Sequence, residues 1–174
     1  MKKLLHPFLV IFLAVVLRLL PHPPNVAPIA SLALFGGCYL NKRYALFVPL
    51  VAMLISDYFL GFHNTMLFVY GSFLLTGLFG IWVRKRKTVK NVIGVSLFSS
   101  LLFYLITNLG VWVVGGLYPK TLPGFLQSYY FAIPFFRNTI IGDLFYTGLF
   151  FGGYELILRV FDLHQSLSRK SAEK

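Results

Sequence analysis

Long apolar runs, separated by short basic or turn-forming stretches, constrain this chain more than any other feature. Six runs can be read, at about residues 4–20, 27–40, 44–62, 65–83, 92–114 and 135–158. A helix that crosses a bilayer needs about 20 mostly apolar residues, and five of the runs approach or exceed that length. The second run, of about fourteen residues, is marginal, so we expect it to be tilted or packed behind loops. The pattern predicts an all-α integral membrane protein with six transmembrane helices.

Composition supports a membrane protein. Hydrophobic residues make up 57% of the chain and charged residues only 12%, whereas about a quarter of the residues in a soluble domain are charged. A net charge of +11 would suggest a nucleic-acid partner in a soluble protein. Here the basic residues cluster between the apolar runs, where they set topology and meet anionic lipid. We therefore expect the lipid bilayer as a partner and no nucleic acid.

The basic clusters mark alternate junctions between the apolar runs. They are Lys2–Lys3, Lys42–Arg43, the stretch Arg84–Lys90, Arg159 and Arg169–Lys170. The positive-inside rule places such clusters in the cytoplasm, which gives cytoplasmic termini and an even number of spans. The first run could instead be a signal peptide, but no small-residue cleavage pattern follows it directly, so we expect it to be retained. We predict one transmembrane domain over residues 1–162 and a basic cytoplasmic tail over 163–174.

Polar side chains in three of the runs agree in depth. Asp57 and Asp143 each lie about five residues from the outer end of their run, and Asn108 lies at a similar level with Tyr104 one turn before it. A carboxylate inside a spanning helix is costly and normally faces a cavity or a partner. This predicts an outward-facing polar pocket between the third to sixth helices. The alternative is structural pairing of the aspartates with Arg18, Arg137 or a helix N-terminus.

Three outer connections could cover such a pocket: the proline-rich loop after residue 20, the turn that carries His63, and the long stretch 115–134. Residues 122–133 could form a short amphipathic or re-entrant helix over the mouth, or contribute to an interfacial aromatic belt. The candidate substrate-binding residues are Asp57, His63, Tyr104, Asn108, Tyr118, Lys120, Arg137, Asn138 and Asp143.

Other polar and small residues have simpler interpretations. Ser72, Thr76, Ser96 and Ser100 are typical of hydroxyls that bond to their own backbone or hold helices together, and Gly148 and Gly152 of a close-packing face. Cys38, the single cysteine, excludes an internal disulfide and is expected to serve packing. No second histidine stands at metal spacing from His63, so no metal site is expected.

The sequence contains no recognisable catalytic motif and no nucleotide-binding loop. We therefore expect no enzyme activity and no cofactor, and an ATP-driven pump would need its ATPase from another subunit. An intramembrane enzyme that uses Asp57 and Asp143 as an acid–base pair remains an alternative, as does an accessory membrane protein without a ligand.

Several strings in the chain resemble an uncharacterised family of bacterial membrane proteins labelled putative transport proteins. They are Asn25–Gly37, Pro49–Asp57, Leu60–His63, Asn108–Trp112, Tyr118–Thr121 and Pro134–Asp143. That family is in turn similar in architecture to the substrate-binding S components of energy-coupling factor (ECF) vitamin transporters. The resemblance implies a six-helix bundle in the bacterial cytoplasmic membrane that captures a small molecule, a vitamin or a precursor, from the outer face for uptake.

The chain departs from S components in its first helix. S components commonly carry an Ala-x-x-x-Ala pattern there, which docks on the transmembrane coupling subunit, whereas residues 8–18 contain Ala14 alone. Partnership with ECF transmembrane and ATPase subunits is therefore one possibility, and action without them is the other. Some solitary S components bind cobalamin through a cysteine, but Cys38 is expected at the cytoplasmic end of its helix, so this role is not carried over.

Overall fold

The protein is all-helical in the computed structural model, which describes residues 7–172 and the side chains of residues 8–164. The α-helices are α1 (Pro7–Leu19), α2 (Ile29–Tyr39), α3 (Lys42–Leu60), α4 (Met66–Val83), α5 (Val89–Val114), α6 (Leu122–Tyr130), α7 (Ile133–Thr147) and α8 (Gly153–Ala172). A short 3-10 helix, η1 (Arg84–Arg86), follows α4, and a π-helix, η2 (Gly148–Gly152), joins α7 to α8. Residues 7–172 contain no strand. The predicted all-α class is confirmed.

Four helical segments are long and apolar enough to cross a membrane: Lys42–Leu60, Met66–Arg86, Val89–Val114 and Ile133–His164. The helices α1 and α2 are apolar but shorter, with 13 and 11 residues. These lengths and hydropathies are compatible with a membrane protein. Six spans stay a prediction, because the two short helices do not reach spanning length by themselves.

The short helix α2 forms the centre of the bundle. All its residues from Ile29 to Cys38 are buried, and it packs against α3, α4 and α7. A helix that is apolar on every side is suited to this position. The short run was expected to be tilted or packed behind loops; in the structure it is buried among helices. The side chain of Arg84 closes the C-terminal end of α2, since its guanidinium donates to the carbonyl oxygens of Gly37 and Leu40.

The crossing of α2 and α4 is close enough to require glycine. A Cβ built on Gly80 would lie 2.4 Å from the carbonyl oxygen of Leu34 and 2.8 Å from the Cα of Gly37. By contrast, a Cβ on Gly148 or Gly152 would meet nothing within 4 Å among the described residues. The expected close-packing face around Gly148 is therefore wrong for the described chain, and those glycines lie in the π-helix instead.

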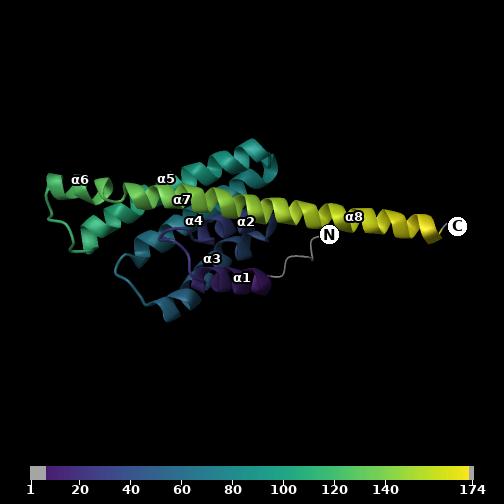
Figure 1. Ribbon diagram of the computed structural model, residues 1–174, viewed down its shortest axis with the longest axis horizontal. Helices are drawn as coiled ribbons and strands as arrows, with labels where there is room; N and C mark the ends of the chain where they lie inside the picture. Colours follow the sequence, from purple (N-terminus) through teal and green to yellow (C-terminus); the bar gives the residue numbers. More distant parts are fainter. Residues whose placement is uncertain (1–6, 173–174) are drawn as a thin grey trace.

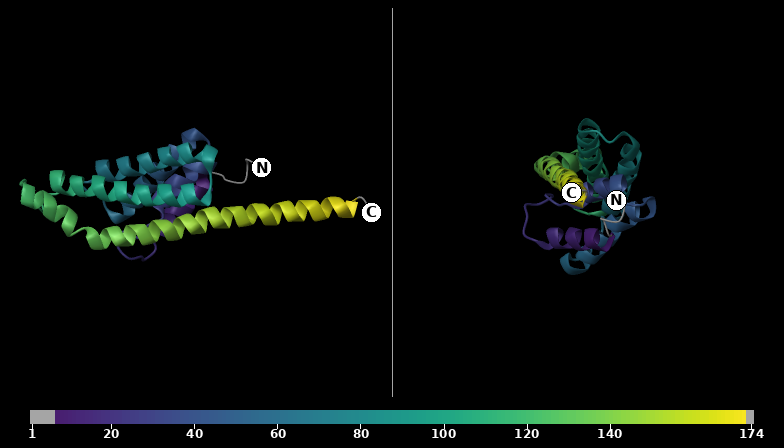
Figure 2. Two further views of the ribbon diagram at one scale, coloured as in Figure 1. Left: turned by 90° about the horizontal axis from the view of Figure 1, so that it is seen from above. Right: turned by 90° about the vertical axis from the view of Figure 1, so that its right-hand side faces the viewer.

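The α7–η2–α8 segment is one long, nearly continuous helix that runs along the bundle and extends beyond it (Figures 1 and 2). Its membrane-compatible part alone has 32 residues, which at about 1.5 Å per residue exceeds a hydrocarbon core of about 30 Å. Helix α8 continues through the expected domain boundary after residue 162. The predicted basic tail is therefore helical as far as Ala172. Lys2, Lys3 and the last two residues lie outside the described chain.

The two ends of the bundle are formed by different elements. The chain reverses at residues 61–65 and 84–88, so α3, α4 and α5 alternate in direction. One end holds α6 and the 61–65 turn, and the opposite end holds the 84–88 loop, the start of α1 and the extension of α8 (Figure 1). Helix α6 matches the short helix expected over residues 122–133, and Thr121 caps it by accepting a hydrogen bond from the Gly124 amide at 3.3 Å.

Candidate functional site

A cavity of about 480 Å³ lies between α1, α2, α3, α4, α5 and α7, beneath the α1–α2 loop. Apolar side chains form most of its wall, including Met53, Val69, Phe73 and Phe103. Its polar lining consists of Arg18, His22, Asn25, His63, Thr139 and Asp143. A mostly apolar hollow with a few convergent polar groups is the usual form of a small-molecule site.

A second cavity, of about 200 Å³, adjoins the first. The two share Asn25, Val69, Phe103 and Thr139 as lining residues. The second extends toward Tyr104 and Asn108, which bring neutral polar groups to its wall. Together the cavities give a site whose charged and titratable groups, Arg18, His22, His63 and Asp143, lie in the first part, and whose second part has neutral polar groups.

Asp143 is the buried carboxylate of the first cavity. It is 3% exposed, and its Oδ2 accepts a hydrogen bond of 2.7 Å from the Ser100 hydroxyl. Its backbone carbonyl accepts a second bond, of 2.9 Å, from the Ser31 hydroxyl. No described residue donates to Oδ1 or forms an ion pair with this carboxylate. Asp143 lines the cavity, and Oδ1 is its carboxylate oxygen without a hydrogen-bond donor among the described residues.

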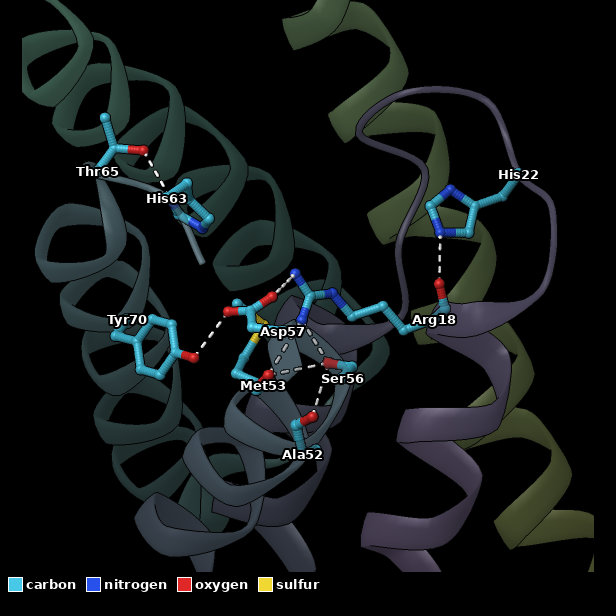
Figure 3. A network of polar contacts seen from close by, with 9 residues as sticks. All are labelled: Arg18, His22, Ala52, Met53, Ser56, Asp57, His63, Thr65 and Tyr70. Carbon is cyan, nitrogen blue, oxygen red and sulfur yellow. Dashed lines mark hydrogen bonds and ion pairs between the residues drawn. The ribbon is translucent and has the colours of Figure 1, made fainter. Parts of the chain in front are cut away.

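Asp57 has the opposite environment, although it is just as deeply buried, at 1% exposure. Figure 3 shows its two carboxylate oxygens engaged from opposite sides: the Arg18 guanidinium pairs with Oδ1 at 2.7 Å, and the Tyr70 hydroxyl donates to Oδ2 at 2.7 Å. Arg18 also donates to the Met53 carbonyl oxygen at 3.3 Å and to the Ser56 hydroxyl. Asp57 lines neither cavity, so structural pairing with Arg18, one of the expected alternatives, is what the structure contains.

The end of α1 and the α1–α2 loop contribute three polar groups that the candidate set from the sequence omitted. Arg18 and His22 line the first cavity, and Asn25 lines both. The His22 ring hydrogen-bonds to the Arg18 carbonyl oxygen at 3.1 Å (Figure 3). Asn25 has a left-handed backbone with φ of 62°, a conformation that asparagine tolerates better than most residues. The prolines of this loop restrict its backbone angles, and they are the feature of the sequence that predicts a rigid loop here.

Four residues of the candidate set from the sequence reach the cavities: Asp143 and His63 in the first, and Tyr104 and Asn108 in the second. The His63 ring is held by the Thr65 hydroxyl at 2.9 Å. The side-chain amide of Asn108 donates a hydrogen bond to the carbonyl oxygen of Tyr104 in its own helix. Thr139, one helical turn before Asp143, lines both cavities. Its four-residue spacing from Asp143 places both side chains on one face of the helix, and this spacing could have added Thr139 to the candidate set.

The other candidates lie away from both cavities. Lys120 donates to the carbonyl oxygens of Trp112 and Val113 and so closes the C-terminal end of α5. Tyr118 stacks on Phe131 with ring centroids 6.5 Å apart. The remaining two are on α7: Asn138 donates to the Pro24 carbonyl oxygen at 3.1 Å, and Arg137 is exposed. Each of these four residues therefore has a contact or an exposed position that does not involve either cavity.

Metal ligands of the usual kind do not gather in the described chain. No group of three or more His, Cys, Asp or Glu side chains among the described residues could hold a metal ion. Cys38 is buried, and its thiol contacts the Gly80 carbonyl oxygen at 3.3 Å in the α2–α4 crossing. This contact fits the expected packing role.

Comparison with known proteins adds a family to this description. No curated protein and no solved structure matches the chain. A family described as a family of unknown function, DUF6580, matches residues 1–167. Because that match covers nearly the whole sequence, the chain is a member of the DUF6580 family.

Proposed function

We propose that this protein captures a small molecule from the outer face of the bacterial cytoplasmic membrane for uptake, in the manner of an ECF S component. The observation that carries the proposal is Asp143, which lines a cavity of about 480 Å³ and whose Oδ1 accepts no hydrogen bond from the described residues. A buried carboxylate without a cation is costly to keep in a bundle of apolar helices. Binding of a ligand at this oxygen would offset that cost.

The lining indicates the chemistry of the ligand. Asp143 favours a group that donates hydrogen bonds, such as an amine, an amide N–H or a hydroxyl, and a cationic donor would bind most strongly. Phe73 and Phe103 stack with centroids 5.3 Å apart and form part of the wall. They suit a flat apolar body. The proposed ligand therefore carries its donor group at one end and an apolar or aromatic portion at the other.

The proposed topology has six membrane-embedded helices with both termini in the cytoplasm. The 20–28 loop and the 61–65 turn border the cavity, whereas the basic stretches Lys42–Arg43 and Arg84–Lys90 lie at the opposite end of α3, α4 and α5. Positive residues concentrate on the cytoplasmic side of membrane proteins. This orientation gives the cavity access from outside.

A cysteine-labelling experiment tests the topology. In a Cys38→Ser background, Leu117→Cys is expected to react with a membrane-impermeant maleimide in intact spheroplasts. Lys85→Cys is expected to react only after lysis, because it precedes α5 at the basic end. Leu117 is 73% exposed, so its cysteine would be accessible. Labelling of Lys85→Cys in sealed spheroplasts would reverse the orientation and with it the outward-facing cavity.

A thermal-shift screen of the purified protein against vitamins and their precursors tests the ligand. A ligand at a hundred times its dissociation constant should add about 2.7 kcal/mol to the free energy of unfolding. We expect Asp143→Asn to lose most of that gain, because the amide carries no charge and competes as a donor. Arg137→Gln, on the same helix but lining neither cavity, should keep it. A folded Asp143→Asn variant with an undiminished shift would remove Asp143 from the site.

The two alternative functions predict different surroundings for the aspartates. An acid–base pair needs two carboxyl groups that face the substrate, but Asp57 is occupied by Arg18 and Tyr70. An accessory protein without a ligand predicts that both carboxylates are fully paired, whereas Asp143 keeps one oxygen for the cavity. Both observations favour capture of a ligand.

Helix α1 lacks the alanine pattern through which S components dock on an energised coupling subunit. Ala14 is 1% exposed and packs within the bundle, so α1 presents no alanine surface to a coupling subunit. We propose action without a shared energising module, with ECF transmembrane and ATPase subunits as the competing arrangement. Co-purification from native membranes distinguishes the two, since a stable ATPase partner would refute solitary action.

A further inference from the structure

Four buried hydroxyl groups from three helices form a group with Asp143, and none of the four lines either cavity. They belong to Ser31 of α2, Ser96 and Ser100 of α5, and Thr147 of α7, each at most 3% exposed. Their oxygens form a circuit: Ser31 Oγ lies 3.1 Å from Thr147 Oγ1, which lies 3.2 Å from Ser96 Oγ. Two of the hydroxyls bond to Asp143 itself. Ser31 Oγ donates to its backbone carbonyl oxygen, and Ser100 Oγ donates to its carboxylate oxygen Oδ2. We call this group the oxygen cluster.

The oxygen cluster differs from the buried hydroxyls of α4. Ser72 and Thr76 donate to the carbonyl oxygen one turn back in their own helix, at 2.7 and 3.0 Å, which is the common arrangement in apolar helices. Ser31, Ser96 and Thr147 instead turn toward one another between helices. Helix adhesion needs one or two such bonds, whereas this cluster collects oxygens from three helices around one carboxylate.

No positively charged side chain among the described residues forms an ion pair with the carboxylate of the oxygen cluster. The Ser100 hydroxyl lies within reach of both Asp143 Oδ2, at 2.7 Å, and the Ser96 carbonyl oxygen, at 3.0 Å, but its single proton serves only one of them. The Arg18 guanidinium, the permanent cation of the adjoining cavity, is engaged by Asp57. The two histidines of that cavity are engaged elsewhere: His22 contacts the carbonyl oxygens of Pro23 and Arg18, and His63 contacts the Thr65 hydroxyl. Asp143 therefore has no ion-pair partner among the described residues.

A π-helix begins one residue after the cluster. Thr147 is the last residue of α7, and η2 (Gly148–Gly152) follows it directly. Single π-turns within α-helices are rare and occur often at functional sites. The π-turn therefore marks the same point of the bundle as the oxygen cluster, by an observation independent of the side chains.

From these contacts we propose that the oxygen cluster binds an alkali metal cation, with Na⁺ as the expected ion. The ligand atoms would be Asp143 Oδ2 and its carbonyl oxygen together with the hydroxyl oxygens of Ser31, Ser96, Ser100 and Thr147. Hard cations take oxygen ligands, and one carboxylate balances one monovalent charge. With the cation in place, Asp143 Oδ1 still accepts a hydrogen bond from a ligand in the cavity, which then need not be charged.

The cation site also supplies an energy source for uptake, a role that rests on the proposed function. Buried ionisable residues in membrane helices mark ion pathways. A cation and a ligand that share one carboxylate would bind cooperatively, because each stabilises the same arrangement of α2, α5 and α7. Binding of the cation itself requires no ligand, so the two proposals can fail separately.

The test is thermal unfolding of the full-length protein in detergent at constant pH and ionic strength, with choline chloride replaced stepwise by NaCl or KCl. We expect a saturable rise in Tm of about 3 °C at ten times the dissociation constant. Thr147→Val should raise the concentration for half of this shift roughly tenfold, and Asp143→Asn should abolish the shift. Thr76→Val, which removes a self-bonded hydroxyl of equal burial, should leave it unchanged.

Two results would overturn the cation site. One is an equal Tm in choline, sodium and potassium; the other is the same cation dependence in Thr147→Val as in wild type. A Tm that follows pH but ignores the alkali cation would assign the missing charge to a proton and refute the metal cation. Any of these outcomes would leave the ligand screen of the proposed function unaffected.

Discussion

Replacement of Arg18 by methionine is expected to destabilise the protein by about 3 kcal/mol, because removal of one partner from a buried ion pair leaves the other charge uncompensated. Asp57 is 1% exposed and would have to bury its charge or take up a proton. The same substitution frees the Ser56 hydroxyl and the Met53 carbonyl oxygen from the guanidinium. Unfolding by SDS titration in mixed micelles measures the loss.

A second substitution separates charge from packing. Adding Asp57→Asn to Arg18→Met should recover at least about 1 kcal/mol, because the orphaned charge disappears while the amide oxygen still accepts from Tyr70. Arg137→Met, which removes an exposed arginine, should change the free energy of unfolding by less than about 0.5 kcal/mol. If Asp57→Asn instead adds its full cost to that of Arg18→Met, the two residues do not act as a pair.

Replacement of Gly80 by alanine is expected to cost about 3 kcal/mol, at the upper end of the usual range for overpacking. The added Cβ would lie 2.4 Å from the Leu34 carbonyl oxygen and 2.8 Å from the Gly37 Cα. Both are backbone atoms of α2, which is buried on all sides and cannot move away as a flexible side chain would. Helices α2 and α4 must therefore separate, and thermal unfolding should show a large drop in Tm.

Gly71 provides the matched control in the same helix. A Cβ there meets nothing within 4 Å, so Gly71→Ala should stabilise the helix by up to about 1 kcal/mol through the higher helix propensity of alanine. The two alanine variants are thus expected to shift Tm in opposite directions. A Gly80→Ala variant as stable as Gly71→Ala would mean that the α2–α4 contact is looser than described.

The length and place of most helices could be predicted from the apolar runs, because an apolar run of spanning length is helical in almost any membrane context. The residues at which the helices begin and end could not be predicted from those runs. The fifth run begins near residue 92, but α5 begins at Val89 because the Thr88 hydroxyl accepts from the Asn91 amide at 3.2 Å. Polar residues at a helix end satisfy free backbone groups, and hydropathy does not register that contribution.

The sequence by itself determined that this chain is helical and apolar, and it singled out two carboxylates inside apolar runs. It did not determine which of them is available. Asp57 meets the Arg18 guanidinium from α1 and the Tyr70 hydroxyl from α4, whereas Asp143 meets only hydroxyls and a cavity. The difference arises from residues far from either aspartate in the chain. Only the packing of α1 against α3 and of α7 against α2 and α5 decides that Asp57 is in an ion pair and that Asp143 forms none with the described residues.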